Sequence, residues 1–263
     1  MAPGMMLKFN IETCTPNVPL ISSIIQSPHL YFSTFRGIVL PEEQQEFYNK
    51  NVKVDDDTCI NICLNSLDQS SNPTWHSERR KRVTASVAHS ILKGKQEETR
   101  KRYFLGSTYH NQNMQYGIDM EEEARSKYME VTGNKVFPCG LLVKPGQCWI
   151  SASPDGLFFD KDNQLGVLEI KCPSSCKDKK IWAPKYLTYK PCLLLKSHPY
   201  YTQVQIQMYV TGAKFAHFFV YSSKDYKLVT VPLDEVYLKE IIPKLEQVYF
   251  TEFLKTLCSK SVE

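Results

Sequence analysis

The sequence lacks a long apolar run. No stretch approaches the about 18 consecutive apolar residues that a membrane-spanning helix requires. The opening residues Met1 to Asn10 also lack the apolar core and small-residue cleavage site of a secretion signal. The 263 residues, of which 42% are apolar and only 11 are glycine, are enough for one sizeable core plus an extension. We therefore expect an intracellular protein, in the nucleus or cytoplasm, that is neither secreted nor inserted in a membrane.

The nine cysteines lack the spacing that would make them structural. Without an export signal they are better interpreted as reduced thiols than as a disulfide framework. Cys172 and Cys176 lie four residues apart, and we favour buried or idle thiols over a structural metal there. Only Cys258 follows Cys192, so the cysteine cluster of an iron-sulfur nuclease is not expected either.

The net charge of +4 is unevenly distributed along the chain. The first 70 residues contain 4 basic and 8 acidic residues, and the remainder contains 28 basic and 20 acidic residues, so the two parts carry −4 and +8. A basic body suits a domain that binds a polyanion, because lysine and arginine neutralise phosphates. A basic solvated surface without a partner explains the charge equally well. We divide the chain into an extension over 1–70, whose role the sequence does not indicate, and a functional domain over 71–258.

Hydrophobic periodicity and turn residues predict a mixed α/β domain after residue 72. A helix is predicted from an N-cap at Thr84 to a stop at Gly94, and a second one over Asp119–Val131 with Gly133 as its C-cap. Further predicted elements are strands over Cys148–Ala152 and Gly166–Lys171 joined as a hairpin through Asp162 and Asn163, a loop or broken helix over Lys185–Ser197, a helix over Tyr200–Thr211, strands over Phe215–Tyr221 and Lys227–Val231, and a final helix interrupted or restarted at Pro243. This order favours a mixed β-sheet flanked by helices.

Two acidic residues and a lysine are the candidate catalytic groups. In a strand, residues two apart share a face, so Glu169 and Lys171 should point the same way, about 7 Å apart, with Ile170 toward the core. If the hairpin brings Asp155 beside Glu169, two carboxylates converge and can bind Mg²⁺, which prefers oxygen ligands. Lys171 would then face the attacking water of a phosphodiester hydrolysis. The alternative is a turn at Asp155 and an exposed Glu169–Lys171 pair without a role.

Several blocks of residues in the same order resemble the YqaJ-type viral recombinase family of the PD-(D/E)XK nuclease superfamily, to which the phage lambda exonuclease belongs. The blocks are Trp75-His76, Arg79, Val83-Thr84-Ala85-Ser86, Gly117 with Glu121 and Ala124-Arg125, Ser153-Pro154-Asp155-Gly156, Leu168-Glu169-Ile170-Lys171-Cys172-Pro173, and Tyr200 with Gln203-Val204-Gln205, Met208 and Val210-Thr211. The resemblance covers roughly residues 75 to 211 and implies a restriction-endonuclease-like fold, with 71–258 as the nuclease domain. It also implies a homotrimer and leaves open a single-strand annealing protein as a partner.

The resemblance assigns roles to individual residues. It implies Mg²⁺, with Mn²⁺ as a substitute, held by Asp155, Glu169, the Ile170 carbonyl and Glu121, with Lys171 as the catalytic lysine and Gln203 close to the site. The adjacent Glu122 and Glu123 leave the register of Glu121 open, and a solvated acidic helix turn is the alternative. Gln203 is equally compatible with a helix-surface amide that has no role.

Arg79 and Ser86 form a predicted pocket for a 5′-terminal phosphate. Ser86 lies in the first turn of a helix, where the backbone N–H groups favour an anion, and a guanidinium can bind phosphate with two hydrogen bonds. The alternative is that the basic stretch from Arg79 to Arg82 is an exposed loop that contacts phosphates nonspecifically. Further predicted DNA contacts are Arg82, Tyr189 and Tyr201, because rings beside cations can stack on unpaired bases.

The sequence therefore predicts a magnesium-dependent DNA exonuclease that degrades duplex ends 5′ to 3′ in recombination or repair. The alternatives are a structure-selective or nonspecific endonuclease and a DNA-binding domain without catalysis.

Overall fold

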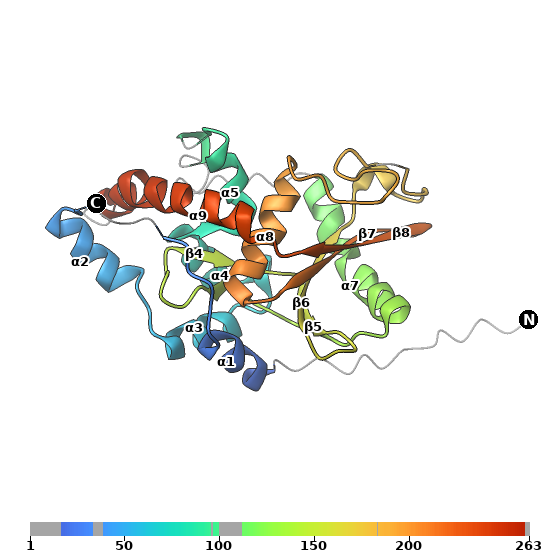
Figure 1. The fold of residues 1–263 in the computed structure, drawn as a ribbon, viewed down its shortest axis with the longest axis horizontal. Coiled ribbons are helices and arrows are strands. Elements are labelled where there is room, and N and C mark those ends of the chain that lie inside the picture. The colour runs from blue at the N-terminus through green and yellow to red at the C-terminus, as the bar shows by residue number, and fades with distance from the viewer. Residues whose placement is uncertain (1–16, 34–38, 96, 100–111, 183, 261–263) are drawn as a thin grey trace, which may run out of the picture.

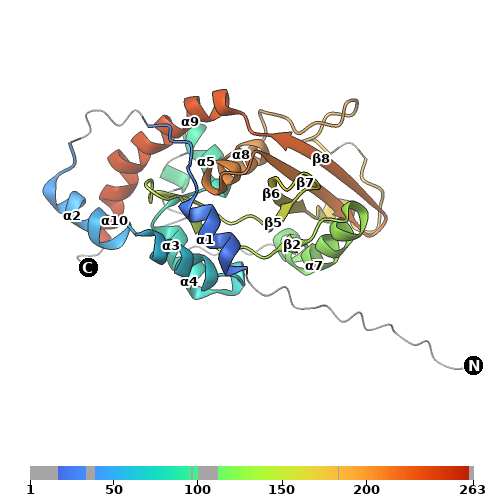
Figure 2. The ribbon, with the colours of Figure 1, turned by 60° about the horizontal axis from the view of Figure 1, so that its bottom comes forward.

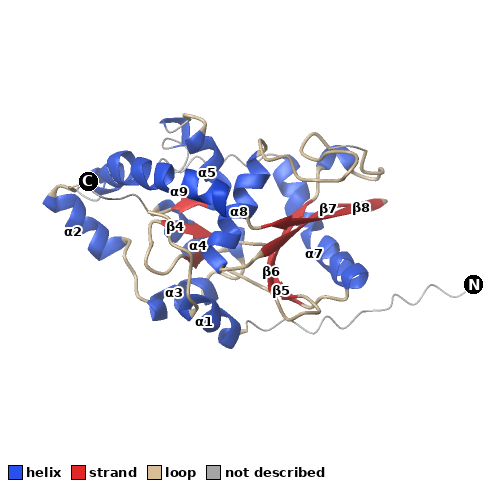
Figure 3. Ribbon diagram, viewed as in Figure 1, coloured by secondary structure: helices blue, strands red, loops and turns tan. Residues whose placement is uncertain are grey.

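The computed structural model describes residues 17–33, 39–95, 97–99, 112–182 and 184–260. The helices are α1 (Val18–Gln26), α2 (Glu42–Asn51), α3 (Asp56–Leu64), α4 (Pro73–Arg80), α5 (Ala85–Leu92), α7 (Gln112–Thr132), α8 (Pro199–Thr211), α9 (Glu235–Val248) and α10 (Leu254–Lys260), with 3-10 turns η1 (Gln69–Ser71) and η2 (Ser174–Cys176). The strands are β1 (Val83–Thr84), β2 (Val136–Phe137), β3 (Leu142–Val143), β4 (Ile150–Ala152), β5 (Gly156–Phe159), β6 (Leu165–Lys171), β7 (Phe215–Ser222) and β8 (Asp225–Pro232). Figure 3 shows the red strands surrounded by blue helices. Among the described helices, none is long and apolar enough to cross a membrane.

A five-stranded mixed sheet, with the strand order β2-β5-β6-β7-β8, runs through the centre of the protein. Only β6 and β7 run parallel, and the other neighbours are antiparallel. Alternate residues of β6 point to opposite faces: Val167 packs in the main core cluster with Val204 of α8, and Leu168 packs with Ala124 of α7 in a second cluster. Figure 2 shows these two helices on opposite sides of the sheet. The predicted mixed sheet flanked by helices is confirmed.

The sequence predicted that the strand around 148–152 pairs with β6, and this prediction is wrong. A hairpin that includes β6 is nevertheless present. The segment around β4 joins a separate three-stranded sheet, β1-β4-β3, where it runs parallel to β1. The strand that forms the hairpin with β6 is β5, and Asn163 adopts a left-handed φ of 57° in the turn between them. Pro154 explains the change of sheet, because it has no N–H for a ladder hydrogen bond and separates β4 from β5.

The helix predictions hold for α5, α7 and α8, with one extension and one correction. Gly94, Gly133 and Gly212 have positive φ values of 75°, 72° and 78°, as expected of residues that end helices, and α7 begins earlier than predicted, at Gln112. The final helix is not interrupted at Pro243, because α9 runs through it to Val248. Buried side chains on both sides of Pro243, such as Ile242 and Leu245, offset the lost backbone hydrogen bond.

The helices before residue 70 contribute side chains to the main hydrophobic core. Ile24 of α1 and Cys63 of α3 are buried in the same cluster as Trp149 and Ile150. The approach is close, since a Cβ atom on Gly140 would lie 2.1 Å from the carbonyl oxygen of Cys63. The α1 and α3 helices lie together at the lower edge of Figure 1. The domain boundary at residue 70 stays a prediction, and the described part before it contributes side chains to the main core.

A buried lysine should make the stability of the protein depend on pH. The side chain of Lys144 is fully buried, and its Nζ atom donates to the carbonyl oxygen of Tyr209 at 2.9 Å. Burial lowers the pKa of Lys144 from 10.5 to about 7. Between these values the unfolded chain holds a proton that the folded chain lacks, so this group makes the free energy of unfolding rise with pH.

We expect Lys144→Met to remove that dependence. Between pH 7.5 and 9.5 the unfolding free energy of the wild type should rise relative to that of Lys144→Met. The rise should be at most about 1.4 kcal/mol per pH unit. Urea unfolding at both pH values measures it. Parallel pH profiles for the two proteins would contradict a depressed pKa at Lys144.

Candidate active site

Asp155 is positioned at the entrance of the β5–β6 hairpin. Its backbone N–H donates to the carbonyl oxygen of Leu168 at 3.1 Å, and its Oδ2 atom accepts from the backbone N–H of Ile170 at 2.6 Å. The register of the hairpin, with Gly156 opposite Leu168, places Asp155 beside the residue that precedes Ile170. The convergence of Asp155 with Glu169 that the sequence predicted is therefore present.

Glu169 is a buried carboxylate on β6, with 1% of its surface exposed. Its Oε1 atom accepts from Nε2 of Gln203 at 2.6 Å and from Nζ of Lys171, and its Oε2 atom accepts from Nε2 of Gln207 at 2.6 Å. Gln203 and Gln207 lie four residues apart on α8 and therefore share one face of the helix. These donors compensate the charge of Glu169, which would otherwise be costly to bury.

Lys171 lies at the end of β6 on the same face as Glu169. It forms an ion pair with Glu169 and places its Nζ atom 4.8 Å from the ring centroid of Tyr200. Burial lowers the pKa of Lys171, but the charges of Glu169 and Asp155 outweigh it and raise the pKa above the usual value. The lysine is therefore a fixed positive charge at the edge of the site.

Glu121 is the acidic residue of α7 that faces the site. Arg125, one helical turn further on, forms an ion pair with Glu121 at 2.5 Å and donates to the backbone carbonyl of Asp155 at 3.2 Å. Glu123 instead accepts from the hydroxyl of Tyr221 at 2.6 Å, and Glu122 is exposed. Of the three glutamates, Glu121 is the one whose charge acts on Asp155, and its role as a metal ligand stays a prediction.

The carboxyl groups repel one another. Burial raises the pKa of Asp155 well above its usual value, and the charges of Glu169 and Glu121 raise it further. Burial also raises the pKa of Glu121, where the attraction of Arg125 opposes it and the charge of Glu169 adds to it. A nearby cation favours the ionised form of such groups.

Arg79 and Ser86, the two residues predicted to bind a 5′-phosphate, are in contact, and their phosphate binding stays a prediction. The Nη2 atom of Arg79 donates to Oγ of Ser86 at 3.1 Å, and its guanidinium lies over the ring of Trp75 at 3.8 Å. Nε1 of Trp75 donates to Oγ of Ser153 at 2.8 Å, two residues before Asp155. The side chain of Trp75 thus links Arg79 to the segment that carries Asp155.

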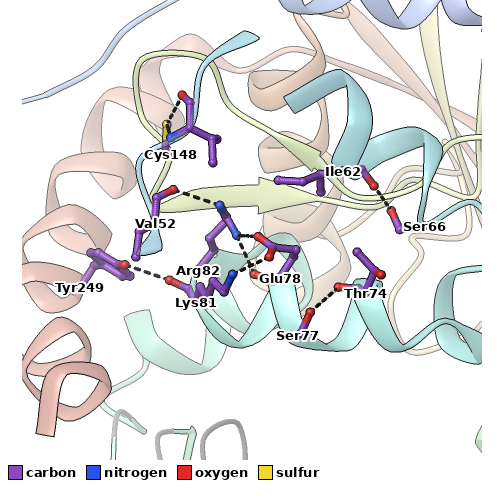
Figure 4. Close-up of polar contacts among 11 residues, drawn as sticks. Val52, Ile62, Ser66, Thr74, Ser77, Glu78, Lys81, Arg82, Cys148 and Tyr249 are labelled. Atoms are coloured by element: carbon purple, nitrogen blue, oxygen red, sulfur yellow. Dashed lines mark hydrogen bonds and ion pairs between the residues drawn. The ribbon is translucent and has the colours of Figure 1, made fainter. Parts of the chain in front are cut away.

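Two of the three further predicted DNA contacts are wrong. Arg82 is 2% exposed, and its guanidinium binds Glu78 at 2.5 Å and the carbonyl oxygen of Val52 at 3.0 Å, so it points into the protein (Figure 4). Tyr201 is 5% exposed and donates to Oδ2 of Asp234 at 2.8 Å. Both side chains are occupied by internal partners. Tyr189 is 69% exposed, and its contact with DNA stays a prediction.

Sequence reasoning missed some groups that position the site. Gln207 was not singled out, although its spacing of four from Gln203 on a predicted helix was a usable signal. Arg125 and Trp75 belonged to the matching blocks but had no assigned role. Their contacts, with the backbone of Asp155 and the side chain of Ser153, join segments distant in sequence, so local patterns do not reveal them.

A hard divalent cation fits the donor set. Asp155, Glu169 and Glu121 offer the carboxylate oxygens that Mg²⁺ prefers, and a bound cation would relieve the repulsion that raises the pKa of Asp155. Within the described part of the chain, no three His, Cys, Asp or Glu side chains are already gathered closely enough to hold a metal ion. The eight described cysteines are free thiols, as the sequence predicted.

The fold is shared with solved alkaline exonuclease structures. The crystal structure of the alkaline exonuclease LHK-Exo from Laribacter hongkongensis matches with a TM-score of 0.54 and 25% identity, over 72% of this chain and 95% of that one. LHK-Exo in complex with dAMP matches with a TM-score of 0.54 and 26% identity, over 70% of this chain and 96% of that one. The restriction-endonuclease-like fold class is therefore confirmed.

Sequence comparisons establish the family. The YqaJ-like viral recombinase domain matches residues 74–214, and the chain belongs to this family. The alkaline nuclease of Autographa californica nuclear polyhedrosis virus is 29% identical over 192 residues, which are 64% of this chain and 45% of that protein. The chain thus spans less than half the length of this curated relative.

Proposed function

We propose that this protein is a magnesium-dependent DNA exonuclease that hydrolyses phosphodiester bonds from duplex ends, 5′ to 3′, in recombination or repair. The observation that carries the proposal is the buried Glu169, held by Lys171, Gln203 and Gln207 beside Asp155. A surface pair without a role would not require three internal donors to one carboxylate. Relatives named as nucleases and exonucleases support the same reaction.

Each side chain has a chemical role in this proposal. Asp155, Glu169 and Glu121 would hold Mg²⁺ or Mn²⁺, together with the Ile170 carbonyl. The chemistry that the bound ion supplies is Lewis-acid activation of the phosphodiester and of water. Lys171 orients the attacking water and stabilises negative charge in the transition state. Gln203 and Gln207 fix the orientation of Glu169, and Arg125 holds the backbone of Asp155.

The preference for DNA ends rests on the Arg79 pocket. A guanidinium stacked on Trp75 and bonded to Ser86 is preorganised to bind a terminal phosphate with two hydrogen bonds. An endonuclease has no need of a terminal phosphate site, which is why we favour end-directed cutting. A homotrimer and an annealing protein as partner are proposals that follow from the family alone.

The test is the degradation of linear and closed circular duplex DNA in Mg²⁺ and in EDTA. We expect loss of the linear substrate only, in Mg²⁺ only, and faster when the ends carry a 5′-phosphate than a 5′-hydroxyl. Arg79→Met should abolish the phosphate preference, at a cost of about 1.5–3 kcal/mol, or roughly 10- to 150-fold in rate at subsaturating DNA. The exposed neighbour Arg80, replaced in the same way, is the matched control.

Other outcomes assign the protein to the alternatives. Cutting of circles in Mg²⁺ would identify an endonuclease, and binding without cutting would identify a DNA-binding domain that has lost catalysis. A 5′-phosphate preference that survives Arg79→Met would remove the pocket from the proposal.

A further inference from the structure

A lysine-rich loop, described over 177–182 and 184–198, connects the two elements that hold the site. It follows η2, which comes shortly after Lys171 at the end of β6, and it leads into α8, which carries Gln203. In Figure 1 it is the gold loop beside the ends of β7 and β8 and near one end of α7.

The base of the loop is firmly attached to the sheet. The side chain of Ile181 is buried, and its backbone N–H donates to Oδ2 of Asp225 at 3.0 Å. Buried Leu187 and Leu194 form an antiparallel bridge that closes the loop. The ring of Tyr186 lies 5.1 Å from that of Tyr200, whose face contacts Lys171. The loop is thus a built surface next to the catalytic lysine.

The outer side of the loop exposes aromatic rings among cations. Trp182 is 77% exposed and Tyr189 is 69% exposed, with Nζ of Lys190 at 5.6 Å from the centroid of the Tyr189 ring. The segment 177–198 contains six lysines and one acidic residue, Asp178, for a formal charge of +5. The lysines are all exposed: Lys177, Lys179, Lys180, Lys185, Lys190 and Lys196. Exposed rings in a cationic segment suit a partner that offers both flat rings and negative charge.

We propose that this loop binds the unpaired nucleic-acid strand next to the active site, with Trp182 and Tyr189 stacking on bases and the lysines contacting phosphates. The proposal rests on the proposed nuclease function for its choice of partner. Rings can stack only on bases that are not already stacked inside a duplex, and a positive groove with aromatic platforms is what single-strand binding requires. The charge of +5 favours a polyanion over an apolar protein partner.

The test is binding of labelled oligonucleotides to the full chain in EDTA, where the proposed cutting does not proceed. Replacing Trp182 and Tyr189 together by leucine should weaken binding of single-stranded DNA about 10-fold or more, and binding of blunt duplex less than 2-fold. The double phenylalanine variant keeps both rings and should bind like the wild type. Both positions are exposed, so none of these changes should unfold the protein.

Tryptophan fluorescence gives a second, direct readout. Trp149 is buried and Trp75 is half-buried, so Trp182 is the tryptophan that a bound base can reach. Single-stranded DNA should quench the emission of the wild type, and the quench should be lost in Trp182→Phe while affinity is retained. Single-stranded RNA of the same length shows whether the loop distinguishes the two sugars.

The inference is overturned if the double leucine variant binds single strands as tightly as the wild type, which would leave the surface to a protein partner. Because binding is measured without cutting, this result is independent of the proposed function. A protein that cuts no DNA but loses single-strand affinity in the leucine variant would refute the nuclease and keep the loop assignment.

Discussion

Replacing Lys171 by methionine is expected to lower the rate of DNA hydrolysis by about 10²- to 10⁴-fold, the range for loss of a group that moves protons or stabilises transition-state charge. The physical reason is that Lys171 is the cation that forms the ion pair with Glu169 and lies near Asp155. Hydrolysis of linear duplex at equal concentrations of folded protein measures the loss. DNA affinity in EDTA should change little, because one lysine among 32 basic residues supplies a small part of phosphate binding.

Lys244→Met is the matched control for this experiment. Lys244 lies on α9, with 59% of its side chain exposed, and forms an ion pair with Glu240 one helical turn away. Its replacement should leave the hydrolysis rate within about 2-fold, because surface pairs of this kind contribute well under 1 kcal/mol. A Lys171→Met protein that keeps more than a tenth of the activity would remove Lys171 from the reaction.

Replacing Arg82 by methionine is expected to destabilise the protein by about 3–5 kcal/mol, the usual cost of removing one partner from a buried ion pair. The side chain of Arg82 is fully buried, and its removal leaves Glu78 and the carbonyl oxygen of Val52 without the guanidinium. Thermal or urea unfolding measures the effect. The DNA affinity of the folded variant should stay within about 2-fold of the wild type, because Arg82 is not at the surface.

The neighbouring Arg80 provides the control for Arg82. Arg80 is exposed, so Arg80→Met should change the unfolding free energy by less than about 0.5 kcal/mol. An Arg82→Met protein of normal stability with weakened DNA binding would restore the DNA-contact assignment that the structure overturns.

Periodicity predicted the elements whose signals are local. The glycines that end α5, α7 and α8 were recognisable because a left-handed φ at a helix end favours glycine. The partner of β6 was predicted wrongly, because strand pairing depends on contacts distant in sequence and only Pro154 marked the change of sheet. The predicted interruption of the final helix at Pro243 is wrong, because buried neighbours on α9 keep the helix continuous.

For the candidate site too, some features follow from the sequence and others only from the tertiary structure. The sequence by itself determined that Glu169 and Lys171 share a face, because strand geometry places residues two apart on one side, and the order of its motifs indicated the nuclease family. The tertiary structure decided which of three adjacent glutamates on α7 faces the site, and that Gln207 joins Gln203 on Glu169. It also decided that Arg82 is internal while Trp182 is exposed. Burial is a property of the packed chain, and a basic or aromatic residue type does not by itself say which side of the surface it occupies.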